Sequence, residues 1–319
     1  PLQACLLMLL VLPRAALGPT RQGRGRPARE GGFRTCGGSA PRARAEAQQR
    51  LTTLRGAQGA AREGSLPVKV VSFDLDDTLW PTGEVVFHAN ELLNGYLRES
   101  YPAIPISKGF EVQEQMKEIR RTAEEADPDF QVHYGKLRRA GIRQLAMKYY
   151  SDEEAETCAQ EGFRIWLQER QDAAGRLLFS DAVSTLRALR GQGGVLIGAI
   201  TNGNGDPRDI APLRPYFDFV VSAEEPDVKH PKPHPRAFEV AMDRAAALAE
   251  SSTEWMAAGV GRENVAYAWL HVGDCIDNDV RAASALGMRT VWYTPPVPEG
   301  AKTWYSTKRG AKNAQFVGQ

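Results

Sequence analysis

The sequence VKVVSFDLDDTLW, residues 68–80, decides the fold of this chain. Its first six residues are mostly β-branched or aromatic, which predicts a short buried strand. Because side chains alternate along an extended chain, Asp74 and Asp76 are expected on one side and Leu75 on the other. Two neighbouring carboxylates repel each other, so this pair needs a cation or a proton between them. The end of the strand is therefore the first candidate for a functional site.

A long helical block follows this strand. Residues 85–177 are predicted to be helical almost throughout, and the block is too long for a loop. Its last helix is expected to begin with Ser151 as the N-cap, with Glu154 three residues further on. The clearest helices are expected over 84–98, 110–121, 134–150 and 152–169.

Strands and helices alternate again after residue 177. The expected order is a helix over 181–190, strands over 195–200 and 217–222, a helix over 235–247, a strand over 269–272, a helix over 278–286 and a strand over 290–293. Such alternation predicts the α/β class, with a Rossmann-like, doubly wound and mostly parallel sheet. The helical block becomes an inserted all-helical domain. Residues 249–267 are expected to be a polar excursion over the surface.

The predicted division of the chain has five parts. They are a signal-like segment over 1–18, a disordered Arg-rich transit segment over 19–66, a core domain over 67–84 and 178–300, the inserted helical domain over 85–177, and a C-terminal tail over 301–319.

The first 66 residues differ in charge from the rest. They hold 11 Arg, no Lys and 3 acidic residues, which is a net charge of +8. The whole chain has 40 Lys and Arg and 39 Asp and Glu, so residues 67–319 hold 29 basic and 36 acidic residues, a net charge of −7. An acidic remainder disfavours a nucleic-acid binder. The apolar run over 4–12 and the Arg-rich stretch behind it resemble the two-part presequence of plastid proteins. A plastid is therefore the expected location, with the mitochondrion or the cytoplasm as alternatives.

Other classes of protein are disfavoured by the cysteines and the hydropathy pattern. The four cysteines are far apart and form no C-x-x-C pair, so neither a zinc site nor a disulfide framework is predicted. No apolar run reaches the roughly 18 residues that a membrane span needs. The oligomeric state cannot be read from the sequence.

Polar side chains follow the later strands as well. Thr201 and Asn202 follow the second predicted strand, Lys232 lies in the loop after the third, and Asp274 and Asp279 follow the fourth. Because reactive groups of open α/β sheets gather beyond the carboxyl ends of the strands, these side chains are expected to meet. Carboxylates, a hydroxyl and a lysine suit a hard divalent cation and a phosphate.

Four motifs occupy these strand ends in order: FDLDDT, ITNG, KPHPRAF and HVGDCIDND. Together they resemble the haloacid dehalogenase superfamily over residues 67–295, in the branch with a helical cap between the first two motifs. Each motif lies at a predicted strand end or in the loop after it, and this context gives the match its weight. The resemblance implies an α/β core with a helical cap, and a Mg²⁺-dependent phosphatase acting on a small phosphorylated metabolite.

The resemblance also implies a role for each residue. Asp74 would be the nucleophile that becomes an aspartyl phosphate. Asp76 would protonate the leaving alcohol and then take a proton from the hydrolytic water. Thr201, Asn202 and Lys232 would hold the phosphoryl group. The implied ligands of Mg²⁺ are the Asp74 carboxylate, the Asp76 main-chain carbonyl, Asp274 and, through water, Asp279.

Alternatives remain for the lysine and for the reaction. Lys229 competes with Lys232, but the superfamily's K-P-x-P-x-x-F spacing to Phe238 favours Lys232. The glycine often found before that lysine is missing, which leaves the path of the loop open. Asp76 argues against a dehalogenase, which attacks carbon and needs neither a metal nor a second aspartate. A phosphomutase or a non-catalytic binder of phosphorylated ligands stays possible, with hydrolysis favoured by analogy.

The cap is expected to select the substrate. The stretches ITNGN, YFDFVVSAE and LHVGD look most like the flavin-related phosphatases, which act on flavin mononucleotide or on 5-amino-6-(5-phospho-D-ribitylamino)uracil. Phosphoglycolate, nucleotide and sugar-phosphate phosphatases are the alternatives. A flavin ring would need an aromatic slot, which Trp80, Tyr134 and Trp166 could supply. Further candidate contacts, each of which could equally be part of a solvated face, are His88, His133, Lys136, Arg138 and Arg139.

Overall fold

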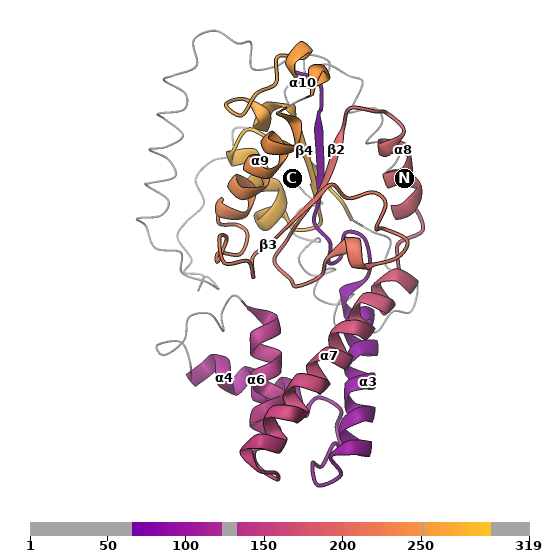
Figure 1. Ribbon diagram of the computed structural model, residues 1–319, viewed down its shortest axis with the longest axis vertical. Helices are drawn as coiled ribbons and strands as arrows, with labels where there is room; N and C mark the ends of the chain where they lie inside the picture. Colours follow the sequence, from indigo (N-terminus) through magenta and orange to yellow (C-terminus); the bar gives the residue numbers. More distant parts are fainter. Residues whose placement is uncertain (1–65, 123–132, 251, 295–319) are drawn as a thin grey trace, which may run out of the picture.

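The computed structural model of the protein describes residues 66–122, 133–250 and 252–294. The predictions for residues 1–18 and 301–319, and for all but the last residue of 19–66, lie outside the described residues. Figure 1 shows a sheet flanked by helices in one half of the molecule and a group of inserted helices in the other. No described helix combines the length and the apolar character needed to cross a membrane.

The sheet has five strands, and every neighbouring pair is parallel. In chain order the strands are β1 (Val70–Phe73), β2 (Leu196–Thr201), β3 (Phe219–Ser222), β4 (Trp269–Gly273) and β5 (Arg289–Trp292). Their order across the sheet is β3-β2-β1-β4-β5. The central strand β1 is buried at all four positions because helices cover both faces of the sheet. The predicted α/β class with a doubly wound parallel sheet is confirmed.

Alternate residues of β1 place their side chains in two apolar clusters, one on each face of the sheet. The helices around the sheet are α8 (Ala182–Arg190), α9 (Arg236–Ala249), α10 (Thr253–Ala257) and α11 (Ala282–Ala285). Figure 1 shows α8 and α9 on opposite sides of the sheet. Val71 and Phe73 pack with Leu186 of α8, whereas Val70 packs with Phe238 of α9. The sheet is therefore held from both sides, which fixes the positions of its strand ends.

The inserted helices lie beyond the carboxyl ends of the strands (Figure 1). They are α3 (Thr82–Ser100), α4 (Glu111–Thr122), α6 (Tyr134–Ala146) and α7 (Asp152–Arg176). They share their own apolar cluster, to which Leu93, Ile142 and Trp166 belong. Ser151 caps α7 in a capping box with Glu154, as predicted. The helical insert between β1 and β2 is thus confirmed, while the exact domain bounds stay a prediction.

Three local predictions were wrong. Residues 249–267 are not a polar excursion, because Trp255 is buried in the apolar cluster that contains Val70 and Phe238. A short irregular turn can bury an apolar residue although its sequence shows no hydrophobic periodicity. The helix expected over 278–286 begins instead with a π-helical turn, η4 (Ile276–Arg281). Helix α7 continues to Arg176 rather than ending at 169, which brings Arg170 into the helix.

Candidate active site

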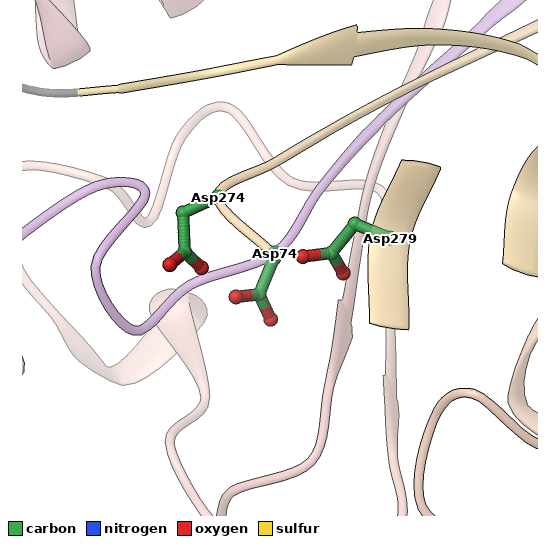
Figure 2. A group of neighbouring side chains, drawn as sticks. All are labelled: Asp74, Asp274 and Asp279. Atoms are coloured by element: carbon green, nitrogen blue, oxygen red, sulfur yellow. The ribbon is translucent and has the colours of Figure 1, made fainter. Parts of the chain in front are cut away.

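Three carboxylates meet beyond the carboxyl ends of β1 and β4. Asp74 follows β1, Asp274 follows β4, and Asp279 belongs to η4. Figure 2 shows the three side chains around one small space, and one carboxylate oxygen from each lies within 4.8 Å of the others. Asp74 and Asp279 are buried, whereas Asp274 is half-buried. The fold therefore brings together, from two strand ends, the acidic residues that the sequence predicted for one site.

Lys232 lies between two of these carboxylates. Its Nζ donates to Asp74 Oδ1 at 2.8 Å and to Asp279 Oδ1 at 2.7 Å, and it also donates to the Ile200 carbonyl at 2.6 Å. The side chain of Lys232 is buried, whereas Lys229 is exposed to solvent. The geometry therefore brings Lys232, and not Lys229, to the carboxylates.

Asn202 holds the loop that carries this lysine. Its Oδ1 accepts from the Lys232 main-chain N at 2.6 Å, and its Nδ2 donates to the Lys232 carbonyl at 3.0 Å. Because both ends of the amide are engaged, Asn202 acts on Lys232 through the backbone. Thr201, at the end of β2, is buried, and its Oγ1 accepts from the Gly203 N–H at 3.0 Å.

Burial and mutual charge set the ionisation of this cluster. Burial raises the pKa of Asp74 well above its ordinary value, the negative charges of Asp279 and Asp274 add to the rise, and Lys232 opposes it. For Asp279, burial is outweighed by the charge of Lys232 and the hydrogen bond from His271, so its pKa is lowered. For Lys232, the two carboxylates outweigh burial and raise the pKa. The cluster thus has one lysine for three carboxylates.

A buried chain of hydrogen bonds, here called the relay, runs from Trp269 through Ser72 and His271 to Asp279 and fixes the tautomer of His271. The indole Nε1 of Trp269 can only donate, and it donates to Ser72 Oγ at 2.7 Å. The Ser72 hydroxyl must then donate its own proton to His271 Nδ1, at 2.7 Å. The remaining ring proton is on Nε2, which faces Asp279 Oδ1 at 3.3 Å. Burial lowers the pKa of His271, in keeping with a neutral ring that donates to Asp279.

Gly273 permits the close approach of Asp279. A Cβ at Gly273 would lie 2.3 Å from Asp279 Cγ, a separation that no side chain tolerates. Asp279 Oδ2 also accepts from the Cys275 N–H at 2.9 Å. The glycine of the fourth motif is therefore required by packing, independently of its turn conformation.

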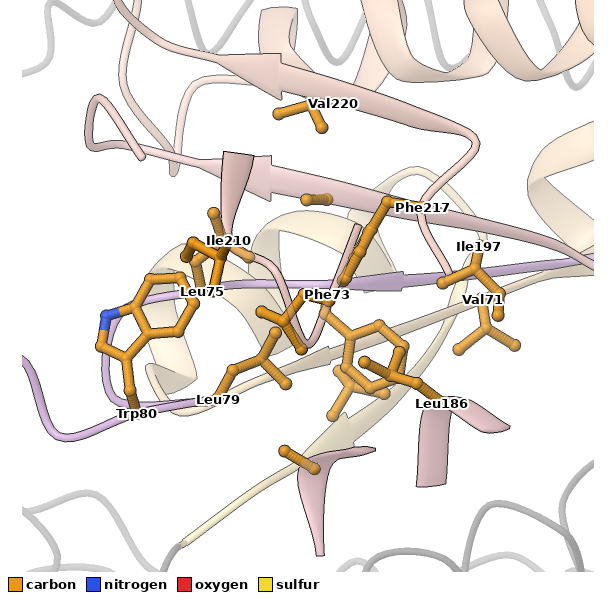
Figure 3. Packing of buried hydrophobic residues seen from close by; sticks show 14 of the residues in the cluster. Val71, Phe73, Leu75, Leu79, Trp80, Leu186, Ile197, Ile210, Phe217 and Val220 are labelled. Atoms are coloured by element: carbon orange, nitrogen blue, oxygen red, sulfur yellow. The ribbon is translucent and has the colours of Figure 1, made fainter. Parts of the chain in front are cut away.

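Asp76 contacts the inserted helices. Its carboxylate accepts from Trp80 Nε1 at 2.9 Å and from Arg170 Nη2 of α7 at 3.0 and 3.1 Å. Figure 3 shows Trp80 packed with Leu75 and Leu79 in the core, with its ring nitrogen at the edge of the cluster. Trp80 is fully buried, so its ring supports Asp76 and does not form an aromatic slot for a substrate.

Two neighbouring aspartates have structural contacts. Asp77 adopts a φ of 66°, and its Oδ1 accepts from the Thr82 N–H at the start of α3 at 2.9 Å, so it stabilises the turn. Asp277 is exposed and accepts from Arg281 at 2.5 Å. The π-helical turn starts before Asp277, which places this residue outside the capping position.

A cavity of about 470 Å³ lies between the core site and the inserted helices. Asp76, Asn202 and Gly203 line it from the core. From the inserted helices it is lined by Thr82, Val86, Gln113, Met116, Lys117, Arg120, Tyr134, Leu137, Arg138, Trp166 and Arg170. This volume is in the range of small-molecule sites.

The sequence analysis found some of the cavity residues and missed others. Tyr134, Trp166 and Arg138 were candidates and do line the cavity, whereas His88 and Arg139 do not. Arg170 was missed because the predicted helix ended one residue before it. A sequence signal was present, since Trp166 and Arg170 are four residues apart and share one face of a helix.

The carboxylate cluster suits a divalent cation. Asp74 and Asp274 offer hard oxygen ligands. Burial raises the pKa of Asp74, and the negative charges of Asp279 and Asp274 add to this rise. Asp279 is less suited to direct ligation because both of its oxygens already accept hydrogen bonds. The residues present therefore fit a metal ion held by Asp74 and Asp274, with Asp279 behind them.

Comparisons with known proteins agree with this geometry. The chain is 27% identical over 243 residues, 75% of this chain and 89% of the relative, to the 5-amino-6-(5-phospho-D-ribitylamino)uracil phosphatase YigB of Escherichia coli. It is 28% identical over 228 residues, 70% of this chain and 83% of the relative, to a glyceraldehyde 3-phosphate phosphatase of Methanopyrus kandleri. Among solved structures, a 2-haloacid dehalogenase from Pseudomonas syringae matches with a TM-score of 0.57 and 31% identity, over 73% of this chain and 88% of that one.

A family model extends the match across the whole arrangement just described. The model of haloacid dehalogenase-like hydrolases matches residues 68–287, from β1 and the loop with Asp74 and Asp76, through the helical insert, to the acidic loop after β4. With the four motifs at the strand ends and Asp74, Lys232 and Asp279 in mutual contact, the chain belongs to the haloacid dehalogenase-like hydrolases.

Proposed function

We propose that the protein is a Mg²⁺-dependent phosphatase that hydrolyses a small phosphorylated metabolite through an aspartyl phosphate on Asp74. The observation that carries this proposal is the contact of the buried Asp74 with Lys232, beside Asp274 and two residues before Asp76. A carboxylate nucleophile, a cation for the phosphoryl oxygens and a second carboxylate for proton transfer are the groups that phosphoryl transfer needs. Two relatives named as phosphatases support this reaction class.

The residues divide the proposed reaction into two steps. Asp74 attacks phosphorus, the bond from phosphorus to the ester oxygen breaks, and Asp76 gives that oxygen a proton. Asp76 then takes a proton from the water that attacks the aspartyl phosphate, which releases phosphate and restores Asp74. Lys232 and Thr201 stabilise the charge on the phosphoryl oxygens, and Asn202 keeps Lys232 in place through its backbone.

Mg²⁺ would be held by the carboxylates of Asp74 and Asp274 and by the main-chain carbonyl of Asp76, with Asp279 acting through water. When bound, the ion supplies positive charge that lowers the repulsion between Asp74 and the phosphoryl group. Oxygen ligands of this kind are those that Mg²⁺ prefers.

One solved structure with the same fold is named a dehalogenase, and this reaction is the main competitor. Asp76 favours the phosphatase, because a dehalogenase attacks carbon and has no leaving alcohol that needs a proton. Arg170 and Trp80 hold Asp76 at the rim of the cavity, where a leaving group would stand. A phosphomutase uses the same groups, and hydrolysis is favoured by the two phosphatase relatives.

Flavin mononucleotide and 5-amino-6-(5-phospho-D-ribitylamino)uracil are the first compounds to test. The similarity to YigB supports the second, and Tyr134 offers an exposed aromatic ring in the cavity, whereas the ring of Trp166 is buried and covered by Arg138. Trp80 cannot contribute to an aromatic slot for the substrate, because it is buried in the core. The similarity to glyceraldehyde 3-phosphate phosphatases places smaller esters in the same panel.

Phosphate release from a panel of esters tests the proposal. The full chain would be assayed with Mg²⁺, with EDTA in place of Mg²⁺, and as Asp74→Asn. We expect release that needs Mg²⁺ and is lost in Asp74→Asn. Chloride release from 2-chloropropionate without phosphate release would establish the dehalogenase instead, and release that persists in Asp74→Asn would remove Asp74 as the nucleophile.

Delivery to a plastid through residues 1–66 is also a proposal, supported by the apolar run and the Arg-rich stretch. Fusing residues 1–66 to a fluorescent protein in algal or plant cells tests it. Plastid fluorescence is expected, and mitochondrial or diffuse fluorescence would favour one of the alternatives.

A further inference from the structure

The cavity above Asp76 is lined by an excess of positive charge. Among the described residues that line it, Lys117, Arg120, Arg138 and Arg170 are cations, and only Asp76 is an anion. Asp76 already pairs with Arg170. The inserted helices therefore present cations to the space in which the non-phosphate part of a substrate would lie.

Arg138 is the best-defined of these cations. It is 8% exposed, its guanidinium lies 3.8 Å from the centre of the Trp166 ring, and its Nη1 donates to Asn90 Oδ1 at 3.1 Å. The same Asn90 oxygen accepts from Trp166 Nε1 at 2.9 Å, so the arginine is held in one orientation. No carboxylate pairs with Arg138 in the part of the chain that the structure describes. Burial lowers the pKa of Arg138, and the positive charge of Arg170 lowers it further.

Arg170 is the second buried cation that lines the cavity. It is 3% exposed, and its Nη2 is used by Asp76, yet its Nη1 is buried without a hydrogen-bond partner. A buried donor of this kind costs free energy unless a ligand satisfies it. Gly205 keeps the space for this group, because a Cβ there would lie 2.5 Å from Nη1.

The two arginines line the same cavity. Arg138 stacks on Trp166, and Trp166 precedes Arg170 by four residues on α7, which corresponds to roughly 6 Å along the helix. Arg170 also touches Asp76, beside the place of the leaving oxygen. An anionic group bound by the arginines would therefore be separated from the scissile phosphate by only a few bonds.

We propose that Arg138 and Arg170, which line one cavity, bind a second anionic group of the substrate, a carboxylate or a second phosphate. The preferred substrates are then phosphate monoesters with an acid group a few bonds from the scissile phosphate. This inference rests on the proposed phosphatase function and narrows its substrate class. It expects flavin mononucleotide and 5-amino-6-(5-phospho-D-ribitylamino)uracil, whose distant ends carry no acid group, to be poorer substrates.

Matched pairs of esters test the subsite. 3-Phosphoglycerate and glycerol 3-phosphate differ by a carboxylate in place of a hydroxymethyl group; fructose 1,6-bisphosphate and fructose 6-phosphate differ by a second phosphate. The full chain with Mg²⁺ is expected to favour the acid member of one pair by about ten- to a hundredfold in kcat/KM, the value of one or two charge-assisted hydrogen bonds. The pair with the larger ratio identifies the acid group as carboxylate or phosphate.

Substitutions of Arg138 locate the preference. Arg138→Met is expected to reduce the ratio within the favoured pair to near one, and Arg138→Lys, which keeps the charge, to retain part of it. Arg139→Met is the matched control, because Arg139 is the next residue of α6 but is exposed and paired with Glu156. The ratio is informative even where stability falls, because a purely structural defect lowers both members of a pair alike.

The inference and the function on which it rests fail in different ways. Equal kcat/KM within both pairs, or the highest kcat/KM for flavin mononucleotide, would overturn the subsite and leave the phosphatase standing. If no ester is hydrolysed, the phosphatase proposal fails, and calorimetric binding of the same pairs to Asp74→Asn decides the subsite. A binding preference for the acid ester that Arg138→Met removes would support it, and equal binding would overturn it.

Discussion

The core site and the cap cavity hold their charges in opposite ways. In the core, Lys232 touches both Asp74 and Asp279, and a neutral His271 supports Asp279 from behind. In the cavity, Arg138 stacks on Trp166 without a carboxylate partner among the described residues. In the core the carboxylates outnumber the lysine that they surround, whereas in the cavity the positive charge of Arg138 faces the place of a ligand.

This difference suggests a division of roles, in which the core site performs the reaction and the cap cavity selects the substrate. The core groups come from strand ends that pair in one register, so their spacing is fixed by the sheet. Most of the cavity groups come from the inserted helices, and among the described residues of these helices Arg170 pairs with the core carboxylate Asp76. Substitutions in the core should therefore abolish turnover of every ester, whereas those in the cavity should change which ester is preferred.

The largest effect is expected from Asp74→Asn. It removes the nucleophile while keeping the shape of the side chain, so kcat should fall by about a thousandfold or more for every ester. Rapid acid quenching of the wild type with labelled ester should trap a phosphorylated Asp74, absent from the variant. Asp277→Asn is the control, since Asp277 is exposed and contacts Arg281. A phosphoenzyme in Asp74→Asn would contradict the assignment.

Lys232→Met should come next, and it should affect both activity and folding. Loss of the ammonium leaves Asp74 and Asp279 buried without their shared cation, which should cost about 3–5 kcal/mol of unfolding free energy. The value of kcat should also fall by about a hundredfold or more. Chemical denaturation and steady-state assays measure the two effects.

Lys229→Met is the matched control for this lysine. Lys229 lies three residues earlier but is exposed, so its loss should stay within about 0.5 kcal/mol. Equal effects at both positions would show that Lys232 acts only through the path of the loop.

A smaller effect is expected from Ser72→Ala, which cuts the relay beneath the site. It leaves Trp269 Nε1 and His271 Nδ1 without their partner, at a cost of about 1–3 kcal/mol. Activity should fall less than in Lys232→Met, because Asp279 keeps its contact with the lysine. Trp269→Phe breaks the same relay at its start, so the double variant should cost less than the sum of the two. If the losses of unfolding free energy in the two single variants add up in the double variant, then Ser72 and Trp269 contribute independently and the relay is contradicted.

Much of the core site could be predicted because its residues are tied to strand ends. Asp74 follows an apolar run whose period shows the strand, and the K-P-x-P spacing selected Lys232 over Lys229. These features depend on short stretches of chain. The tautomer of His271 could not be predicted, because it depends on Ser72 and Trp269, which meet only when β1 and β4 pair.

The cavity was less predictable for a physical reason. Arg138 and Trp166 lie on different helices, and their stacking depends on how α6 packs against α7. Arg170 fell just outside the predicted helix, so its contact with Asp76 was missed. The burial of Trp255 was not predicted either, because this residue lies in an irregular turn whose sequence has no hydrophobic periodicity. Contacts between elements carry no local signature in the sequence.

The smallest effect is expected at the far end of α7. Ser151→Ala removes the capping box and should cost about 1 kcal/mol, measured by denaturation. Arg170 lies 18 residues after Asp152 on this helix, roughly 27 Å away, so kcat/KM and the preference between paired esters should not change. Thr157→Ala, whose hydroxyl bonds only its own helix at Glu153, is the control. If Ser151→Ala alters the ester preference, then the position of Arg170 depends on the stability of the whole helix, and selection cannot be separated from the folding of the cap.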